Sequence, residues 1–246
     1  MRPTHVLTAT LGLVAGAAQA DESTTQRAPV FDPLWRAEVP IEFDFYVLAQ
    51  SWQPEFCHGK ESQYPGCTAP LEFWRTHFTM HGLWPDLTHG KHPGFCGGAP
   101  FDADLIEKAL GIQTLLQFWP NVKVSASSPD YPEFWKHEWM RHGTCSGLEQ
   151  VEYFTSAINI IRNDTLSTPS VIQENVGKSL PADKVRAAYA DTPVALKCDH
   201  GGVLSQVFSC WGKDAQHRPT ARQPCPEHIL SEDTCTKGTI LIPAFP

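Results

Sequence analysis

Two short segments of the chain hold most of the side chains that could do chemistry. One is residues 81–86, His-Gly-Leu-Trp-Pro-Asp, and the other, residues 132–145, contains Glu138, Arg141 and His142. On a helix with about 100° per residue, Glu138 lies about 40° from His142 and about 60° from Arg141. An acid, a cation and an imidazole therefore share one helix face. The density of Phe and Trp in this segment argues against a face that is only solvated.

A zinc protease is one alternative, because His137-Glu138 begins like the H-E-x-x-H motif. That motif needs a second His four residues after the first, so that both imidazoles reach one metal. Position 141 is Arg, and the next His, at 142, lies roughly 140° around the helix from His137. We therefore expect no metal site and no cofactor.

The segment 81–86 has the composition of a base-binding pocket. A lone histidine such as His81, after a predicted strand, is more often structural than catalytic. Gly82, however, allows a chain or ligand to approach closely, Trp84 offers a ring for stacking, and Asp86 can accept hydrogen bonds from a base edge. Together these side chains resemble a pocket for an unpaired nucleobase.

Both segments resemble the active-site signatures of the ribonuclease T2 family. Members of this family are secreted and usually acid-active endoribonucleases. The matching stretches are His81-Gly82-Leu83-Trp84-Pro85-Asp86 and Phe134-Trp135-x-His137-Glu138-Trp139-x-x-His142-Gly143-Thr144-Cys145. The resemblance implies cleavage of single-stranded RNA with low base specificity. The 2′-OH is the nucleophile, a 2′,3′-cyclic phosphate forms and is hydrolysed to a 3′-phosphate, and one base and one acid suffice without a metal.

The resemblance also implies a role for each residue. His142 matches the general base, His81 the general acid and Glu138 the third catalytic residue. Arg141 and Glu138 would stabilise the pentacoordinate transition state, and His137 would help to bind phosphate. Two imidazoles in opposite protonation states predict a mildly acidic optimum. Many relatives carry Lys where this chain has Arg141, so contacts to the phosphoryl oxygens are expected to differ in detail.

Base recognition is assigned in the same way. Trp84 and Asp86 match the first base pocket of the family, and Phe134 matches a stacking residue of the second. His92 or Phe95 could supply the other aromatic wall of the first pocket, and both could equally pack within a loop. Gln50 is shifted by one residue from the pattern of relatives, which in a strand moves a side chain to the opposite face, so we assign it no base contact.

The elements that position these residues predict one α+β domain. Alternation of Phe43, Phe45, Val47 and Ala49 predicts a buried strand from residue 41. Residues 78–81 predict a second short strand. Helices are predicted at 102–110 with Asp102 as N-cap, 113–119, 132–141, 151–161, 169–176 and 181–190, and strands at 194–198, 203–211 and 239–242. Strands at both ends with helices between them favour one domain, residues 41–246, and the resemblance implies an antiparallel sheet with several helices packed on it.

Residues 1–20 predict an export signal. Arg2 provides a positive start, residues 6–18 are apolar or small, and Ala18-Gln19-Ala20 is a cleavage pattern before Asp21. The apolar run is shorter than a membrane span needs, so we expect no membrane anchor. Residues 21–40 are polar and rich in proline, which predicts an extended segment. We expect secretion to the medium or delivery to a periplasm, vacuole or lysosome-like compartment.

The eight cysteines in an exported chain predict disulfides. No pair has C-x-x-C spacing, and eight cysteines allow about 105 pairings, so the residues alone leave the pairing open. The family resemblance implies four pairs by order along the chain: Cys57 with Cys67, Cys96 with Cys145, Cys198 with Cys235, and Cys210 with Cys225.

The net charge of −8, from 19 Lys and Arg against 27 Asp and Glu, argues against a broad basic surface for nucleic acid. A single-stranded RNA substrate would have to be bound locally.

The 11 histidines make the sign of the charge depend on pH. We expect those outside the two segments to lie at the surface, including His58, His77, His89, His200, His217 and His228. We expect a monomer. Asn163-Asp164-Thr165 is a sequon that predicts glycosylation in a eukaryotic secretory pathway.

A second hypothesis is a secreted recognition protein or toxin whose effect depends on its surface rather than on catalysis. A chain released from catalysis is free to lose one of the two motif histidines. This chain keeps both His81 and His142, which favours the enzyme.

Overall fold

An antiparallel five-stranded sheet carries the site in the computed structural model, which describes residues 42–199 and 201–246. Its strands are β1 (Phe45–Ser51), β2 (Thr79–Asp86), β4 (Ala195–Cys198), β5 (Leu204–Lys213) and β6 (Pro219–Gln223). The order is β2-β1-β5-β4, with β6 also paired to β5. A separate two-stranded sheet pairs β3 (Lys178–Pro181) with β7 (Thr239–Ile242).

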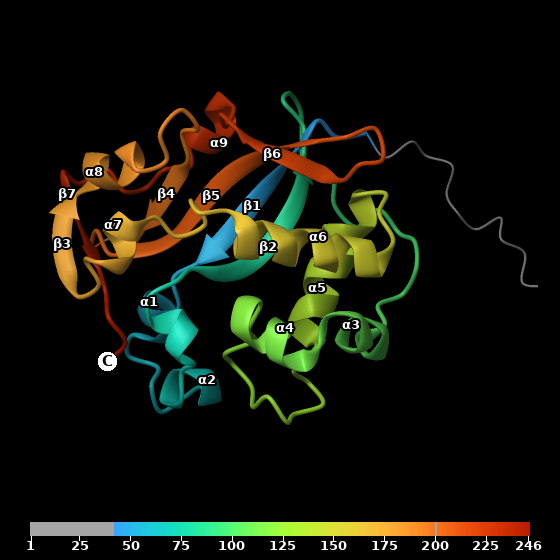
Figure 1. The fold of residues 1–246 in the computed structure, drawn as a ribbon, viewed down its shortest axis with the longest axis horizontal. Coiled ribbons are helices and arrows are strands. Elements are labelled where there is room, and N and C mark those ends of the chain that lie inside the picture. The colour runs from blue at the N-terminus through green and yellow to red at the C-terminus, as the bar shows by residue number, and fades with distance from the viewer. Residues whose placement is uncertain (1–41, 200) are drawn as a thin grey trace, which may run out of the picture. The chain divides into compact units, whose positions relative to one another are not determined.

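Helices surround this sheet (Figure 1). The longer ones are α3 (Ala103–Leu110), α4 (Ile112–Phe118), α5 (Glu133–Arg141) and α6 (Gln150–Asn163). Short helical segments are α1 (Gln53–Cys57), α2 (Pro65–Thr68), η2 (Glu72–Arg75), η3 (Gly143–Cys145), α7 (Ser170–Gln173), α8 (Ala182–Ala187) and α9 (Glu227–Leu230). This arrangement confirms the predicted α+β fold with helices packed on an antiparallel sheet.

Both faces of β1 are buried. Tyr46 and Leu48 pack into a core shared with α4, α5 and α6, while Phe45, Val47 and Ala49 pack on the other face with Phe208 of β5 and residues of α9. Burial on both faces explains why the run from Phe45 to Ala49 is apolar or aromatic throughout.

The strand predicted at residues 78–81 is longer than expected. β2 continues through the whole His81–Asp86 motif, because those residues pair with β1 as far as Phe45 opposite Asp86. Pro85 is tolerated since β2 is the outer strand of the sheet order, where a missing N–H breaks no ladder. The motif is therefore part of the sheet and not a loop after it.

Other predicted elements agree with the structure to different degrees. Asp102 caps α3 by accepting a hydrogen bond from the N–H of Leu105 at 3.0 Å. In place of the helices predicted at 169–176 and 181–190, the structure has the shorter helices α7 and α8. Strands β3 and β6 were not predicted.

The predicted export signal and the extended segment, residues 1–40, lie outside the described residues. Within the described part, no helix combines the length and hydropathy of a membrane span.

Four disulfides staple the fold. They join Cys57 to Cys67, Cys96 to Cys145, Cys198 to Cys235, and Cys210 to Cys225. These are the pairs that the family resemblance implies.

Candidate active site

The two motif segments meet at one cavity of about 320 Å³. Strand β2 contributes three lining residues and helix α5 with the residue after it contributes four, and the rest come from β1, β5, α9 and the loops. The lining residues are Val47, His81, Trp84, Asp86, His92, His137, Glu138, Arg141, His142, Phe208, Ile229 and Glu232. All the predicted catalytic and phosphate-binding residues are thus gathered at one place.

A β-bulge aims His81 into this cavity. Ala49 of β1 pairs with Gly82 and Gln50 pairs with Met80, so His81 is the extra residue between them. In a regular strand His81 would point to the same face as Leu83, which is buried in the helical core. The bulge lets His81 share the cavity face with Trp84 instead.

Helix α5 brings the second set of groups to the same cavity. Glu138 and Arg141 lie in its last turn, and His142 follows as the capping residue, its N–H bonded to the carbonyl of Glu138 at 3.0 Å. Glu138 is buried, Arg141 is half-buried and His137 is exposed. The shared face predicted for Glu138, Arg141 and His142 is present.

The imidazole of His81 is held between two side chains. Its Nδ1 lies 3.1 Å from Oε1 of Gln206 on β5, and its Nε2 lies 3.8 Å from Oε1 of Glu138. An amide oxygen can only accept, so Nδ1 carries a hydrogen and Nε2 faces the cavity. Burial lowers the pKa of His81, and the bond to Gln206 acts in the opposite direction. Gln206 was not anticipated from the sequence.

Trp84 links the two motif segments. Its Nε1 donates to Oε2 of Glu138 at 3.0 Å, and its indole stacks on His142 with centroids 5.0 Å apart. The same indole meets His81 edge-on at 5.2 Å. Base stacking by this ring stays a prediction, and in the structure the ring also contacts both imidazoles.

Gly82 makes the link between Trp84 and Glu138 possible. A Cβ at this position would lie 2.1 Å from Oε2 of Glu138 and 2.2 Å from Nε1 of Trp84. The groups that approach Gly82 closely are therefore the hydrogen-bonded side chains of Trp84 and Glu138.

Burial changes the pKa values of Glu138 in α5 and of His142 just after it. It raises the pKa of Glu138 to about 7, against the lowering effects of the Trp84 hydrogen bond and of Arg141. It lowers the pKa of His142 to about 3, helped by the positive charges of Arg141 and nearby histidines. His142 Nδ1 is buried without a hydrogen-bond partner. In mild acid, His142 is an unprotonated base and Glu138 is largely a neutral carboxylic acid.

Helix α9 forms a wall that the sequence did not reveal. Ile229 and Glu232 line the cavity, and Nε2 of His228 lies 3.8 Å from Oδ1 of Asp86. Burial raises the pKa of Asp86, and its Oδ1 also accepts the N–H of Leu87 at 2.7 Å. No motif marks Ile229 of α9 or Glu232 two residues after it, because they reach the cavity only through the fold.

The remaining predicted base contacts differ in their placement. Phe134 is half-buried with its ring centroid 5.9 Å from His81, and it is not among the residues that line the cavity. Of the two proposed aromatic walls, His92 lines the cavity and Phe95 does not. Gln50 is fully buried and donates to Ser167, which agrees with assigning it no base contact.

The other histidines are not all surface residues. His77 is half-buried and stacks on Phe73, and burial lowers its pKa. His217 is half-buried, with Nδ1 3.0 Å from the carbonyl of Ser146. His58, His89 and His228 are exposed, and His200 lies outside the described residues.

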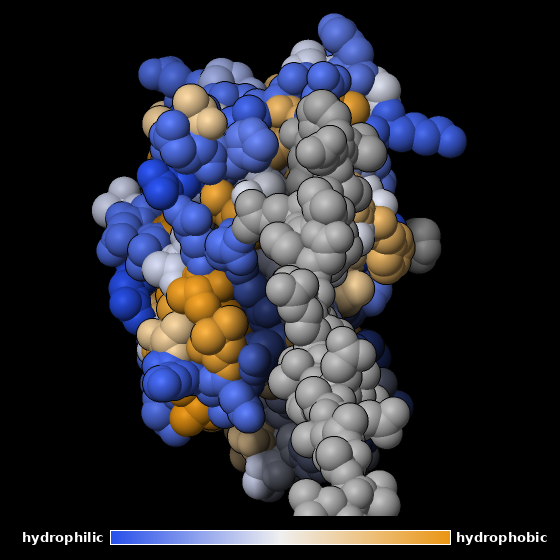
Figure 2. Space-filling model, turned by 90° about the vertical axis from the view of Figure 1, so that its right-hand side faces the viewer, coloured by the Kyte–Doolittle hydropathy of each residue, from blue (hydrophilic) through white to orange (hydrophobic). Residues whose placement is uncertain are grey.

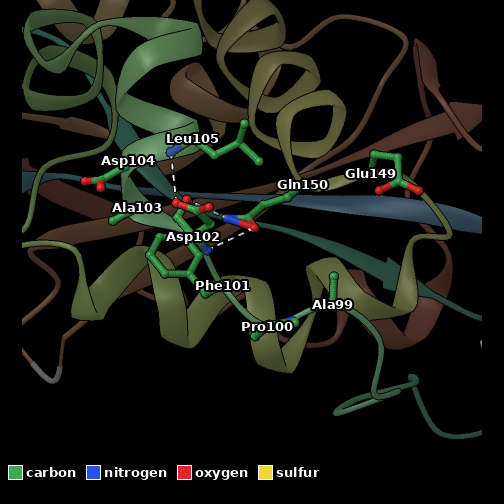
Figure 3. A pocket seen from close by; sticks show the side chains of 9 residues that line it. All are labelled: Ala99, Pro100, Phe101, Asp102, Ala103, Asp104, Leu105, Glu149 and Gln150. Atoms are coloured by element: carbon green, nitrogen blue, oxygen red, sulfur yellow. Dashed lines mark hydrogen bonds between the residues drawn. The ribbon is translucent and has the colours of Figure 1, made fainter. Parts of the chain in front are cut away.

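A second hollow, of about 550 Å³, has a different character (Figure 3). It lies between the start of α3 and the start of α6. Its polar groups serve the fold, because Gln150 exchanges two hydrogen bonds of 3.1 Å with the backbone of Asp102. Its titratable lining residues are the acids Asp102, Asp104 and Glu149, which would repel phosphate. We therefore place the active site at the histidine-lined cavity.

Metal ligands are not grouped in the described part of the chain, where no set of three or more His, Cys, Asp or Glu side chains is arranged to hold an ion. His137 and His142 both line the cavity. The residue one helical turn after His137 is Arg141, whose guanidinium is not a metal ligand.

Comparisons with known proteins identify the family of this chain. Residues 43–220 match the family model described as the Ribonuclease T2 family. Ribonuclease 1 of Arabidopsis thaliana is 32% identical over 184 residues, which cover 69% of this chain and 76% of the relative. Ribonuclease MC of Momordica charantia is 36% identical over 186 residues, with 70% and 91% coverage.

The fold has solved counterparts as well. A crystal structure of RNase NT in complex with 5′-AMP aligns with a TM-score of 0.64 and 27% identity, over 83% of this chain and 100% of that chain. With the family model spanning most of the chain and the motif residues gathered in one cavity, the chain belongs to the ribonuclease T2 family of endoribonucleases.

Proposed function

We propose that this protein cleaves single-stranded RNA by transphosphorylation without a metal, through a 2′,3′-cyclic phosphate to 3′-phosphate ends. The observation that carries the proposal is that His81 and His142, far apart in sequence, line the same cavity. RNA supplies its own nucleophile, so a base and an acid on either side of one phosphate are sufficient.

His142 is the general base in this mechanism. Its low pKa keeps the imidazole unprotonated in mild acid, so that it can take the proton from the 2′-OH. The negative charge of a bound phosphodiester would offset the positive charges that lower its pKa, which strengthens it as a base. Stacking on Trp84 fixes the plane of the ring.

His81 is the general acid. With Nδ1 held by Gln206, its Nε2 is the atom that delivers a proton to the departing 5′-oxygen. Burial places its pKa below the ordinary value of 6.5. The protonated, active form is therefore lost as pH rises through that lowered pKa, which predicts a mildly acidic optimum.

Glu138, Arg141 and His137 bind the phosphoryl oxygens. The pKa of Glu138 leaves it mostly protonated in mild acid, and because Trp84 donates to Oε2, the proton belongs on Oε1. From there it donates a hydrogen bond to a phosphoryl oxygen without repelling it. Arg141 supplies a positive charge to the transition state, and the exposed His137 adds a hydrogen-bond donor beside it.

Base recognition uses the carboxylate side of the cavity. Asp86 and Glu232 offer acceptor oxygens to base edges, and Phe134 beside His81 is the proposed stacking residue for the second base. Hydrogen-bond acceptors alone do not select a single base, in line with low base specificity.

We further propose that the protein is secreted and monomeric. Residues 1–20 have the pattern of an export signal, and four disulfides suit an oxidising compartment. Asn163 is exposed at the end of α6, where a glycan could be attached.

Cleavage of a dinucleoside phosphate in EDTA tests the mechanism. His81→Ala and His142→Ala are each expected to lower kcat by about 10²–10⁴-fold. His58→Ala, which removes an exposed histidine away from the cavity, is the matched control and should keep wild-type activity. Product analysis should find the 2′,3′-cyclic phosphate first. Equal rates in the wild type and His142→Ala, or loss of activity with EDTA, would contradict the proposal.

A further inference from the structure

Phe95 is an unusually exposed aromatic residue beside the active site. Of the described residues, three large hydrophobic ones are prominently exposed: Leu71, Phe95 and Leu105. Phe95 is the most exposed of them, at 65%. On the face shown in Figure 2, most of the visible described surface is hydrophilic, with hydrophobic residues in small groups. A single exposed apolar side chain is common on protein surfaces, so the significance of Phe95 depends on what holds it beside the cavity.

The backbone of Phe95 is in a conformation that a bulky residue rarely adopts. Its φ is +55°, in the left-handed region, where Gly or Asn is accommodated more easily. Such strain persists where the surrounding structure holds a residue in place, and it is concentrated at functional sites.

Two contacts hold Phe95 beside the C-terminal end of helix α5. Its N–H donates to the carbonyl of Arg141 at 2.9 Å. The next residue, Cys96, is bonded to Cys145 just beyond α5. As a result, the Phe95 ring lies over the guanidinium of Arg141, 5.7 Å from centroid to carbon. The ring is thus held at the Arg141 edge of the cavity without lining it.

The loop that carries Phe95 also differs in charge from the rest of the chain. Residues 87–101 contain Lys91, His89 and His92 and no Asp or Glu, in a protein with a net charge of −8. All three side chains are exposed. A loop that combines a lysine and two histidines with an exposed aromatic ring, and has no acid, suits single-stranded nucleic acid, because basic side chains contact phosphates and the ring stacks on a base.

We propose that Phe95 is a stacking platform for an unpaired nucleobase of the RNA substrate, on a nucleotide beyond the two that flank the scissile phosphate. The inference rests on the proposed RNA-cleaving function and extends it to a third base-binding position. Arg141 holds the scissile phosphate, and Phe95 stacks the base of a nucleotide further along the strand as the strand leaves the cavity. His92, which lines the cavity, remains available to the first base.

Two substrates separate this platform from the catalytic cavity. One is a dinucleoside phosphate, which does not extend to Phe95. The other is a DNA hexanucleotide with a single ribonucleotide, which has one cleavable bond because only that residue carries a 2′-OH. Phe95→Ala is expected to raise KM for the hexanucleotide by about 5- to 150-fold, the range for loss of one base stack, and to leave the dinucleoside phosphate unchanged.

Matched variants control for folding and for the identity of the ring. Phe95→Trp should keep the low KM for the hexanucleotide, whereas Phe95→Asn, which suits a positive φ, should raise it while leaving the melting temperature at least as high. Leu105→Ala removes another exposed apolar side chain and should change neither substrate. An abasic nucleotide at the stacked position should raise KM for the wild type and have little effect in Phe95→Ala.

The outcomes are distinct. A KM unchanged by Phe95→Ala on the hexanucleotide, or raised equally on both substrates, would overturn the platform while leaving the proposed cleavage reaction intact. A wild-type protein that cleaves neither substrate would overturn the proposed function, and this inference with it.

Discussion

The indole Nε1 of Trp84 donates a hydrogen bond to Oε2 of Glu138 at 3.0 Å, joining strand β2 to helix α5 across 54 residues of sequence. The bond orients the carboxyl that faces His81 and holds the indole against which His142 stacks. One contact thus sets the relative positions of the three groups that we propose to be catalytic.

Gly82→Ala should disrupt that contact. The new Cβ would occupy the space of the two bonded atoms, so Trp84 and Glu138 must both move. A displacement of about 1 Å at a catalytic site can cost about 10²-fold, and we expect kcat/KM for a dinucleoside phosphate to fall by about that factor. Gly238→Ala is the control, since a Cβ there meets nothing within 4 Å. Wild-type activity in Gly82→Ala would show that the Trp84 contact is dispensable.

Glu138→Gln should alter the dependence of stability on pH. The pKa of Glu138 is about 7 in the folded protein, above its ordinary value of 4.5. Between these values the folded state binds more protons than the unfolded state, so the contribution of this carboxyl is complete below pH 4.5 and is lost as pH rises through 7. The free energy of unfolding of the wild type relative to Glu138→Gln should fall by about 3 kcal/mol over that window.

Urea unfolding at several pH values between 4 and 8 measures this difference. The wild type must be compared with Glu138→Gln at each pH, because His142 changes the free energy of unfolding with pH in the opposite direction. Its pKa of about 3 means that its contribution is present above pH 6.5 and is lost as pH falls toward 3. A wild-type minus variant difference that stays constant with pH would contradict the raised pKa of Glu138.

Arg141 should be replaceable by Lys but not by a neutral residue. Arg141→Lys keeps the positive charge toward the phosphoryl oxygens, and we expect kcat for a dinucleoside phosphate to stay within about tenfold of the wild type. Arg141→Gln removes the charge and should lower kcat by about 10²–10³-fold. Similar losses in the two variants would indicate that geometry, and not charge, is the contribution of this side chain.

Removing either of two disulfides should affect the stability and the activity of the protein to different degrees. The bridge from Cys96 to Cys145 closes 49 residues of chain and that from Cys57 to Cys67 closes 10. Chain entropy predicts losses of about 4 and about 3 kcal/mol for the respective paired Ser variants. Only the first pair adjoins the cavity, so only its variant should also lose activity toward RNA under conditions where both remain folded. Thermal unfolding and initial rates test this pair of expectations.

The sequence predicted helix α5 and the shared face of Glu138, Arg141 and His142, because helical spacing depends on local residues alone. The spacing of Glu138 and His142, the Asp102 cap and the apolar period of α6 all belong to this class. The cysteine pairing and the roles of the histidines came from the family resemblance, since neither follows from the residues by themselves.

Features that depend on partners distant in sequence were not predicted. The extent of β2 and the position of its bulge are set by pairing with β1. Gln206 beside His81, and Ile229 and Glu232 at the cavity, come from the C-terminal third of the chain, where no motif marks them. The second function of Trp84, holding imidazoles and a carboxyl, requires the assembled site.

The bulge in β2 makes this strand sensitive to length as well as to composition. His81 reaches the cavity only because one residue of β2 is left over in the pairing with β1. Deleting Met80, for example, would pair His81 with Gln50 in a regular ladder and turn the imidazole to the face of Leu83, away from the cavity. Natural variation at this motif should therefore consist of replacements and not of insertions or deletions.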